Sequence, residues 1–212
     1  MDMRLEKDSM GELEVPSDAL YGGNTRRAQL NFPISNLRFG RSFIKSLGLI
    51  KQSAAETNLN LNLIDKRLAE AIIDSSQEVI DGDHDSSFVV DIFQTGSGTS
   101  TNMNVNEVIS NLSILKLGGA IGSRDPVHPN DHVNKGQSSN DVIPTAIHIA
   151  AAISINDDLI PSMKILEKSL DKKSKEFWEI VKTGRTHLQD ATPIRLGQEF
   201  KGYTGQIKNS IR

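Results

Sequence analysis

Hydrophobic side chains recur every three or four positions along most of the chain, which is the spacing of one face of an α-helix. This pattern appears in five segments, at 43–54, 61–72, 105–115, 159–181 and 196–211. Residues 142–153, VIPTAIHIAAAI, are apolar on nearly all sides, as expected of the central helix of a bundle. The sequence therefore predicts a mainly α-helical protein.

Two short stretches near the start of the chain, RLEKD and GELEV, predict a pair of strands around a turn. Polar residues and glycines cluster at 81–87, 118–137 and 183–193, and these clusters predict loops between the helices. In the last loop we expect Asp190 to cap the following helix and Pro193 to lie near its first turn.

Composition excludes several classes of function. Charged residues make up 24% of the chain and its formal net charge is −3, which gives no basic surface for nucleic acid or for a membrane. The absence of cysteine excludes a disulfide framework, a thiolate nucleophile and a cysteine-based zinc site. The N-terminus lacks an apolar signal core, so we expect a cytoplasmic protein with no membrane span.

Two polar stretches stand just before predicted helices, QTGSGTSTNMN at 94–104 and NKGQSSND at 134–141. Their Ser, Asn and Asp side chains could simply cap the helices. Alternatively, helix N-termini bind anions, and two such ends facing one another could hold the two carboxylates of a small dianion. The four hydroxyls of Ser97, Thr99, Ser100 and Thr101 exceed the need of a single cap.

A third polar stretch, GRTHLQDATP at 184–193, places a hydroxyl, an imidazole, an amide and a carboxylate within five positions. The hydroxyl belongs to Thr186 and the imidazole to His187. Histidine titrates near neutral pH, which suits acid–base chemistry. This stretch is therefore a candidate wall of an active site.

These three stretches resemble the motif blocks of class II fumarases, the iron-independent fumarate hydratases of the fumarase/aspartase superfamily. HPNDHVNKGQSSND and the opening EKDSMGELEVPSDALYGGNTRRAQLNFPIS are similar to further blocks of that family. The resemblance covers nearly the whole chain, in order. Thr186-His187 and Ser138-Ser139-Asn140-Asp141 are typical of fumarases, whereas aspartases carry Thr-Gln and Ser-Thr-Asn-Asp at these places.

The resemblance implies the reversible hydration of fumarate to malate, a reaction of the tricarboxylic acid cycle, without a cofactor. It gives His187 a part in handling water and the departing hydroxyl. The residues implied in binding the dicarboxylate substrate are Ser97, Gly98, Thr99, Ser138, Ser139, Asn140 and Thr186.

The resemblance also implies a second, outer dicarboxylate site at His128, Pro129, Asn130 and Asp131. The family often has an arginine two positions before Val-His-Pro, but here Asp125 stands there and Arg124 is displaced by one, so we expect this outer site not to bind anions normally. His128 and His132 have a spacing that can ligate a metal. Pro129 argues against a helix there and no third ligand is evident, so we expect no metal.

Family members are homotetramers of about twice this length, with sites assembled from several subunits. Their signature loop, Gly-Ser-Ser-x-Met-Pro-x-Lys-x-Asn, carries the catalytic serine and does not occur in this sequence. We therefore expect an N-terminal lyase domain over 1–137 and the beginning of a central helical bundle over 138–212, inactive alone. A non-catalytic fragment that binds dicarboxylates or assembles with a partner chain, and an aspartate ammonia-lyase, remain as alternatives.

Overall fold

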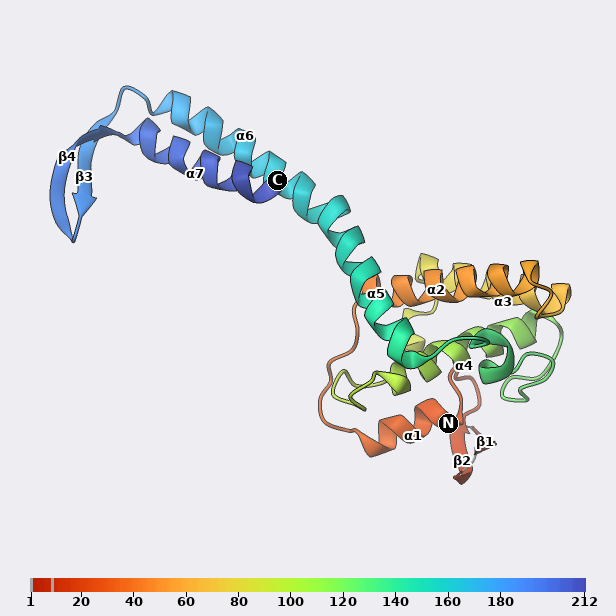
Figure 1. Ribbon diagram of the computed structural model, residues 1–212. Helices are drawn as coiled ribbons and strands as arrows, with labels where there is room; N and C mark the ends of the chain where they lie inside the picture. Colours follow the sequence, from red (N-terminus) through yellow and green to blue (C-terminus); the bar gives the residue numbers. More distant parts are fainter. Residues whose placement is uncertain (1, 9) are drawn as a thin grey trace. The chain divides into compact units, whose positions relative to one another are not determined.

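The computed structural model describes residues 2–8 and 10–212 of the chain (Figure 1). Contacts divide the chain into two compact units, Met1–Ala151 and Ala152–Arg212, and we describe each unit by itself. The protein is mainly α-helical, as predicted, and carries two small antiparallel hairpins. Within the described residues, no helix is both long enough and apolar enough to cross a membrane.

The first unit begins with the predicted hairpin and continues with helices (Figure 1). Strand β1 (Met3–Asp8) pairs antiparallel with β2 (Gly11–Pro16), and Arg4 lies opposite Val15. The helices and short helical turns that follow are α1 (Gly23–Asn31), α2 (Arg41–Asn60), α3 (Lys66–Asp81), η1 (Asp85–Ser87), α4 (Thr99–Lys116), η2 (Pro129–Val133) and α5 (Ser139–Ser154).

The core of this unit lies where α2 and α3 pack together and α3 packs on α4. Leu47 of α2, Ile72 of α3 and Val105 of α4 are fully buried in it. Because burying each such side chain stabilises the fold by about 1.5–3 kcal/mol, the predicted apolar faces determine how these helices pack.

The helix predicted over 61–72 begins too early in the sequence, because α3 starts at Lys66. The backbone of Asn62 is left-handed, with φ 56°, and the side chain of Asp65 caps α3 by accepting the N–H of Arg67 at 2.9 Å. Leu61 is exposed in the turn between α2 and α3. The apolar spacing ran across this turn by coincidence, and the cap decides where the helix starts.

The second unit is a pair of helices joined by a hairpin (Figure 1). Its elements are η3 (Ile155–Leu159), α6 (Ile160–Glu176), β3 (Val181–Thr186), β4 (Gln189–Arg195) and α7 (Leu196–Ile211). The helices α6 and α7 pack side by side, and the rings of Phe177 and Phe200 meet edge to face with centroids 5.1 Å apart. The second helix follows the predicted stripe over 196–211 closely.

The loop predicted over 183–193 is wrong, because this stretch forms the β3–β4 hairpin. Its two-residue turn is His187-Leu188, and both residues are left-handed, with φ 46° and 62°. Two successive positive φ values define the hairpin turn whose twist matches that of the flanking strands. The register shifts at Gly184, where a Cβ atom would lie 2.9 Å from the carbonyl oxygen of Thr192.

The roles predicted for Asp190 and Pro193 at the start of α7 are also wrong, because both residues lie within β4. Asp190 pairs across the hairpin with Arg185, with 3.6 Å between Oδ1 and Nη1. The helix begins later, at Leu196, where the N–H of Arg195 donates to Oε1 of Gln198 at 2.7 Å. Val181, predicted in the preceding helical stripe, instead opens β3.

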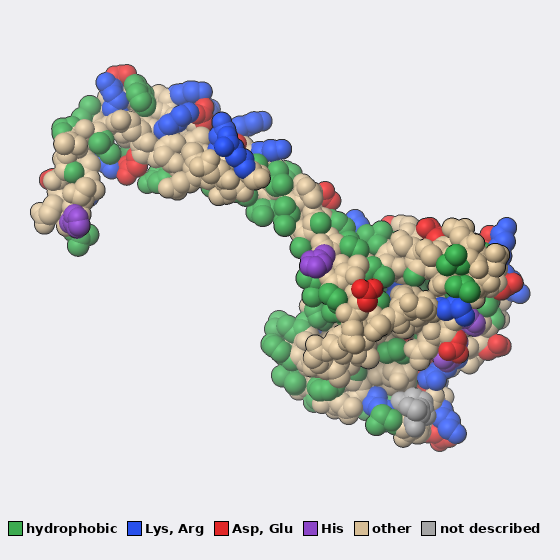
Figure 2. Space-filling view, viewed as in Figure 1, with side chains coloured by type: hydrophobic (Ala, Val, Ile, Leu, Met, Phe, Trp, Pro, Cys, Tyr) green, Lys and Arg blue, Asp and Glu red, His purple; other side chains and the backbone are tan. Residues whose placement is uncertain are grey.

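Large apolar side chains remain exposed along the second unit (Figure 2). Ile165 is 67% exposed on α6, and Leu159, Leu166, Trp178 and Tyr203 are each exposed by more than four tenths. Soluble monomers rarely expose contiguous apolar patches above a few hundred Å². These faces therefore need a covering surface.

We predict that the purified chain self-associates through these faces at micromolar concentration. Sedimentation velocity should show species larger than a monomer, and Leu166→Glu should shift the distribution toward the monomer. Lys164→Glu, at a nearby exposed position, is the matched control and should shift the size distribution much less. A clean monomer of the unmodified chain would contradict this prediction.

Candidate active site

The N-termini of α4 and α5 meet through a chain of hydroxyl groups. Oγ of Ser97 lies 2.7 Å from Oγ1 of Thr99, which lies 3.1 Å from Oγ of Ser139. Ser97 and Thr99 are exposed, and Ser139 is half-buried. Of the two interpretations of these stretches, capping alone does not require the two helix ends to meet, whereas an anion site does. The geometry therefore favours a polar, solvent-accessible site with two helix N-termini.

Glycine is required at position 98, immediately before α4. Its φ is 67°, and a Cβ atom there would lie 2.8 Å from Cγ1 of Ile143 on α5. A side chain would cost about 1–2 kcal/mol in backbone strain and would also push α5 away. Gly98 thus lets the two helix ends approach each other closely enough for their hydroxyls to bond.

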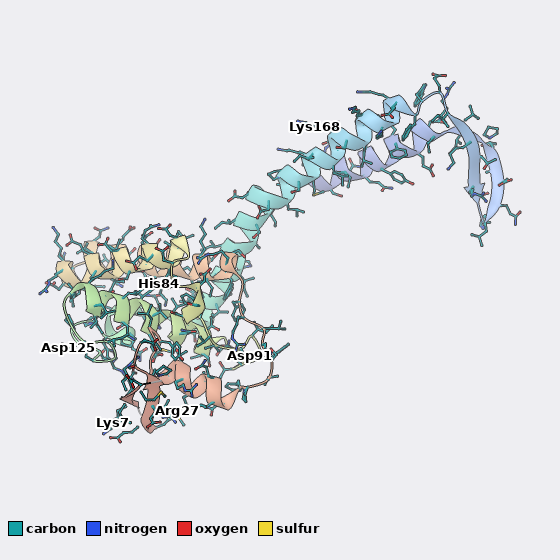
Figure 3. The ribbon with its side chains drawn as sticks, turned by 180° about the vertical axis from the view of Figure 1, so that it is seen from behind. Lys7, Arg27, His84, Asp91, Asp125 and Lys168 are labelled. Atoms are coloured by element: carbon teal, nitrogen blue, oxygen red, sulfur yellow. The ribbon has the colours of Figure 1, made fainter. Side chains whose placement is uncertain are left out.

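Gln94 shapes the loop that leads into α4. Its Nε2 donates to Oγ1 of Thr101 at 2.6 Å and to the carbonyl oxygen of Asp91 at 2.8 Å. The N–H of Thr101 donates back to Oε1 of Gln94 at 2.9 Å. Asp91, labelled in Figure 3, accepts the N–H of Phe93 and the hydroxyl of Ser35. These contacts hold residues 94–101 in one conformation.

Ser138 is the cap of α5. Its carbonyl oxygen accepts the N–H of Val142 at 2.9 Å, and its Oγ accepts the N–H of Asn140 at 3.3 Å. The side chain of Asn140 is exposed next to this cap. Ser138 thus fills the simpler role predicted for it, while Ser139 reaches toward α4.

A buried lysine lies behind the two helix ends. Lys51 of α2 is fully buried, and its Nζ donates to Asn102, Asn134 and Gln137, each at 2.9 Å. Burial lowers the pKa of Lys51 from 10.5 to about 7. All three acceptors are neutral amide oxygens, so no carboxylate offsets the desolvation of the ammonium group.

The residues predicted for an outer site surround η2. Nδ1 of His128 accepts the N–H groups of Asn130 and Asp131 at 3.3 and 3.2 Å. The N–H of His128 donates to Nδ1 of His132 at 2.8 Å. Pro129 is buried, whereas the side chains of Asn130 and Asp131 are exposed. Both imidazoles therefore use Nδ1 to hold the backbone of the one-turn helix.

Asp125, which stands where the family often has arginine, is exposed in the loop between α4 and η2 (Figure 3). The neighbouring Arg124 is half-buried and its φ is 59°, a conformation that side chains rarely adopt. The expectation that this loop weakens the outer site stays a prediction.

Thr186 and His187 belong to the second unit, on the β3–β4 hairpin. Thr186 is the last residue of β3 and pairs with Gln189, and His187 occupies the first position of the turn. Both side chains are exposed. Leu188, the other turn residue, is 94% exposed in a left-handed conformation that is strained for its type. The turn thus presents the imidazole to solvent at the end of the hairpin.

The structure therefore gathers the predicted site residues in two places. The hydroxyl chain and the cap of α5 lie in the first unit, and Thr186 and His187 lie in the second.

Comparison of the sequence with protein families gives a match over residues 11–212 to a family described as Lyase. The chain belongs to this lyase family.

Relatives of this lyase chain are fumarate hydratases. Over 210 residues it is 56% identical to the fumarate hydratase class II of Halobacterium salinarum, covering 99% of this chain and 44% of that one. It is 53% identical over 210 residues to the human mitochondrial fumarate hydratase, covering 98% of this chain and 41% of that one.

Solved structures agree with the sequence comparison. The crystal structure of recombinant class II fumarase from Schistosoma mansoni matches with a TM-score of 0.94 and 42% identity, covering 99% of this chain and 44% of that one. The resemblance to class II fumarases is confirmed. The chain spans less than half the length of each of these relatives.

Sequence reasoning missed the residues that support the hydroxyl chain. Gln94, Asn134 and Gln137 were visible within the polar stretches, but nothing in the sequence distinguished them from loop residues. The position of Lys51 in the sequence carries a signal. This lysine interrupts the buried stripe of α2 between Leu47 and Ala55, where a charged side chain has no place without partners.

We predict a pH-dependent stability contribution from Lys51. Its pKa is about 7 in the folded protein and 10.5 in the unfolded chain, so the unfolded chain binds one more proton between these values. The free energy of unfolding should therefore rise with pH across that window, by up to about 1.4 kcal/mol per pH unit, relative to Lys51→Met. Urea denaturation of both proteins at successive pH values measures the difference.

Lys66→Met, which removes an exposed lysine of α3, is the matched control. It should leave the difference from the unmodified protein nearly constant with pH. A constant difference for Lys51→Met as well would show that the lysine titrates alike in the folded and unfolded states.

Proposed function

We propose that this chain forms part of a fumarate hydratase that interconverts fumarate and L-malate. The observation that carries the proposal is the hydroxyl chain from Ser97 through Thr99 to Ser139, which joins two helix N-termini. The sequence identity of 56% between this protein and a class II fumarate hydratase supports the same reaction. Both substrates are small dianions, and this site offers neutral donors and two positive helix ends.

In this proposal one carboxylate of the substrate lies at the N-terminus of α4, against Ser97, Thr99 and the backbone of Gly98. The other end lies against Ser138, Ser139 and Asn140 at α5. The family resemblance gives Thr186 a further hydroxyl contact with the substrate. Hydroxyl and backbone N–H donors bind carboxylates without bringing a charge of their own. Support comes from the contact between the two helix ends and from the exposure of their hydroxyls.

Malate becomes fumarate by losing a proton from the carbon beside one carboxylate and hydroxide from the neighbouring carbon. The family resemblance assigns the uptake of that proton to the serine of the signature loop. Removing the proton places a second negative charge on that carboxylate, and donors positioned beforehand stabilise this charge. We assign His187 the protonation of the departing hydroxyl, which leaves as water. In the reverse direction the same imidazole accepts a proton from the attacking water.

The remaining assignments rest on the family resemblance. We propose a second dicarboxylate site at His128, Pro129, Asn130 and Asp131, which Asp125 weakens. We also propose an N-terminal domain over 1–137 and a helical bundle that begins at 138. The proposed assembly is a cytoplasmic homotetramer. The exposed apolar faces of α6 and α7 support assembly, and the exposed side chains of Asn130 and Asp131 support a surface site.

Replacing His187 tests the chemical assignment. His187→Asn keeps a polar side chain but removes the titratable ring, and it should slow turnover by roughly 10²–10⁴-fold. Fumarate hydration, followed by the loss of fumarate absorbance, measures this in the protein produced from its complete gene.

His148→Asn provides the control, because His148 is an exposed histidine of α5 to which we assign no role. It should leave turnover within about threefold. If His187→Asn had equally little effect, His187 would have no catalytic role. Ammonia release from aspartate without fumarate hydration would show an aspartase instead.

Replacing Thr99 tests the binding assignment. Thr99→Val keeps the shape of the side chain but deletes a donor to a carboxylate, a contact worth about 1.5–3 kcal/mol. Fumarate should bind about ten- to a hundredfold more weakly, with the pH dependence of the rate unchanged. Thr57→Val, on the exposed face of α2, is the matched control. Unchanged affinity with a shifted pH profile would contradict the assignment.

A further inference from the structure

Lys51 occupies a position that the proposed chemistry does not use. The ammonium group is fully buried and lies within 2.9 Å of three amide oxygens, from Asn102, Asn134 and Gln137. Among the described residues, no carboxylate forms an ion pair with it. Burying an ammonium group without a carboxylate is costly, so Lys51 depends on these three hydrogen bonds.

The three acceptors connect the lysine to both helix ends of the candidate site. Asn102 lies in the first turn of α4, three residues after Thr99. Gln137 immediately precedes Ser138, the cap of α5. The side chains also bond to one another, because Nδ2 of Asn102 donates to Oδ1 of Asn134 at 3.2 Å.

The loop from Asn134 to Gln137 is held together by further hydrogen bonds of the same residues. Nδ2 of Asn134 donates to the carbonyl oxygen of Gln137 at 3.1 Å, and Nε2 of Gln137 donates to the carbonyl oxygen of Val133 at 2.9 Å. Each amide thus has its NH₂ group committed to the loop and its oxygen turned to Lys51. Nζ of Lys51 thus bonds to both the loop and α4, in addition to the direct bond between Asn102 and Asn134.

The protonation state of that nitrogen decides whether all three bonds form. An ammonium group has three N–H donors and no lone pair, so it matches three acceptors. A neutral amine has only two N–H donors, and its lone pair would face the third amide oxygen. Deprotonation of Lys51 therefore removes one of the contacts that join α2, α4 and the loop before α5.

Other titratable groups near Lys51 could produce a similar pH dependence. The elements packed against α2 are α3, α4 and η2. Their charged or titratable side chains, with those of α2 and the 134–137 loop, are Arg41, Lys45, Glu56, Lys66, Arg67, Glu70, Asp74, Glu78, Asp81, Glu107, Lys116, Asp131, His132 and Lys135. The one imidazole among them is His132, and burial lowers its pKa from 6.5, away from that of Lys51.

We propose that Lys51 is a positioning residue of the dicarboxylate site, whose ammonium group fixes the N-terminus of α5 against that of α4. It acts through Asn102 and Gln137 and does not contact the substrate. The inference rests on the proposed function for its ligand, but its structural part can be tested without any ligand.

The first test is an NMR titration of the protein without ligand. The side-chain signals of Lys51 report its own protonation, and the backbone amides of residues 99–101 and 138–140 report the two helix ends. We expect these amides to shift with the same midpoint as Lys51. In Lys51→Met this shared transition should vanish, whereas in Lys66→Met, an exposed lysine of α3, it should remain.

The second test adds fumarate as the probe. Its affinity should fall as pH rises through the midpoint of Lys51, and saturating fumarate should raise that midpoint, because coupling between two binding events is reciprocal. Lys51→Met should bind fumarate roughly ten- to a hundredfold more weakly, as expected for losing hydrogen bonds to a charged group, with no dependence on pH in this range.

These tests separate the two proposals. If the amides follow Lys51 but fumarate does not bind, Lys51 positions the helix ends and the proposed function fails. If fumarate binds but the amide signals do not shift with the titration of Lys51, the positioning role is overturned and the function stands. The same holds if fumarate leaves the midpoint of Lys51 unchanged. If Lys51→Met does not fold, the titrations of the unmodified protein decide alone.

Discussion

Helix α4 is buried along most of its length, yet eight of its buried side chains are polar. All of them have hydrogen-bond partners, although Oδ1 of Asn106 has none. These side chains are Thr101, Asn102, Asn104, Asn106, Glu107, Ser110, Asn111 and Ser113. A buried polar group without a hydrogen bond costs about 1–3 kcal/mol. In the first unit, separate segments of the chain form hydrogen bonds with these side chains of α4. Glu107 alone accepts the N–H groups of Gly22, Asn24 and Thr25, and so holds the start of α1.

The candidate site is a consequence of the same constraint at the N-terminal end of α4. Gln94 satisfies Thr101, and Lys51 satisfies Asn102 while also holding the loop before α5. The helix end that remains free for a ligand is thus bounded by groups whose own partners are fixed. Such preorganised donors need little rearrangement when charge develops on a substrate, which is the main source of electrostatic catalysis.

Periodicity predicted α2, α4 and α7 because their buried faces repeat at helical spacing, and the motif stretches predicted two polar helix N-termini that could face one another. Two kinds of feature escaped. The β3–β4 hairpin turns on His187-Leu188, which lacks the Asn-Gly or Asp-Gly pair that marks such turns, and its register depends on a bulge at Gly184. The amides around Lys51 depend on contacts between residues more than fifty positions apart, which no local pattern contains.

The placement of charge in the proposed site suits a reaction whose substrate is already a dianion. Donors held in place beforehand stabilise the extra negative charge that forms on one carboxylate when the proton leaves. Ser97, Thr99 and Ser139 contribute dipoles only, while the amino group of Lys51 lies buried behind the helix ends. Because the lysine acts through Asn102 and Gln137, it can align the donors without competing for the carboxylates. A site of this design gains selectivity from where its dipoles point, and it remains sensitive to the single proton that keeps them aligned.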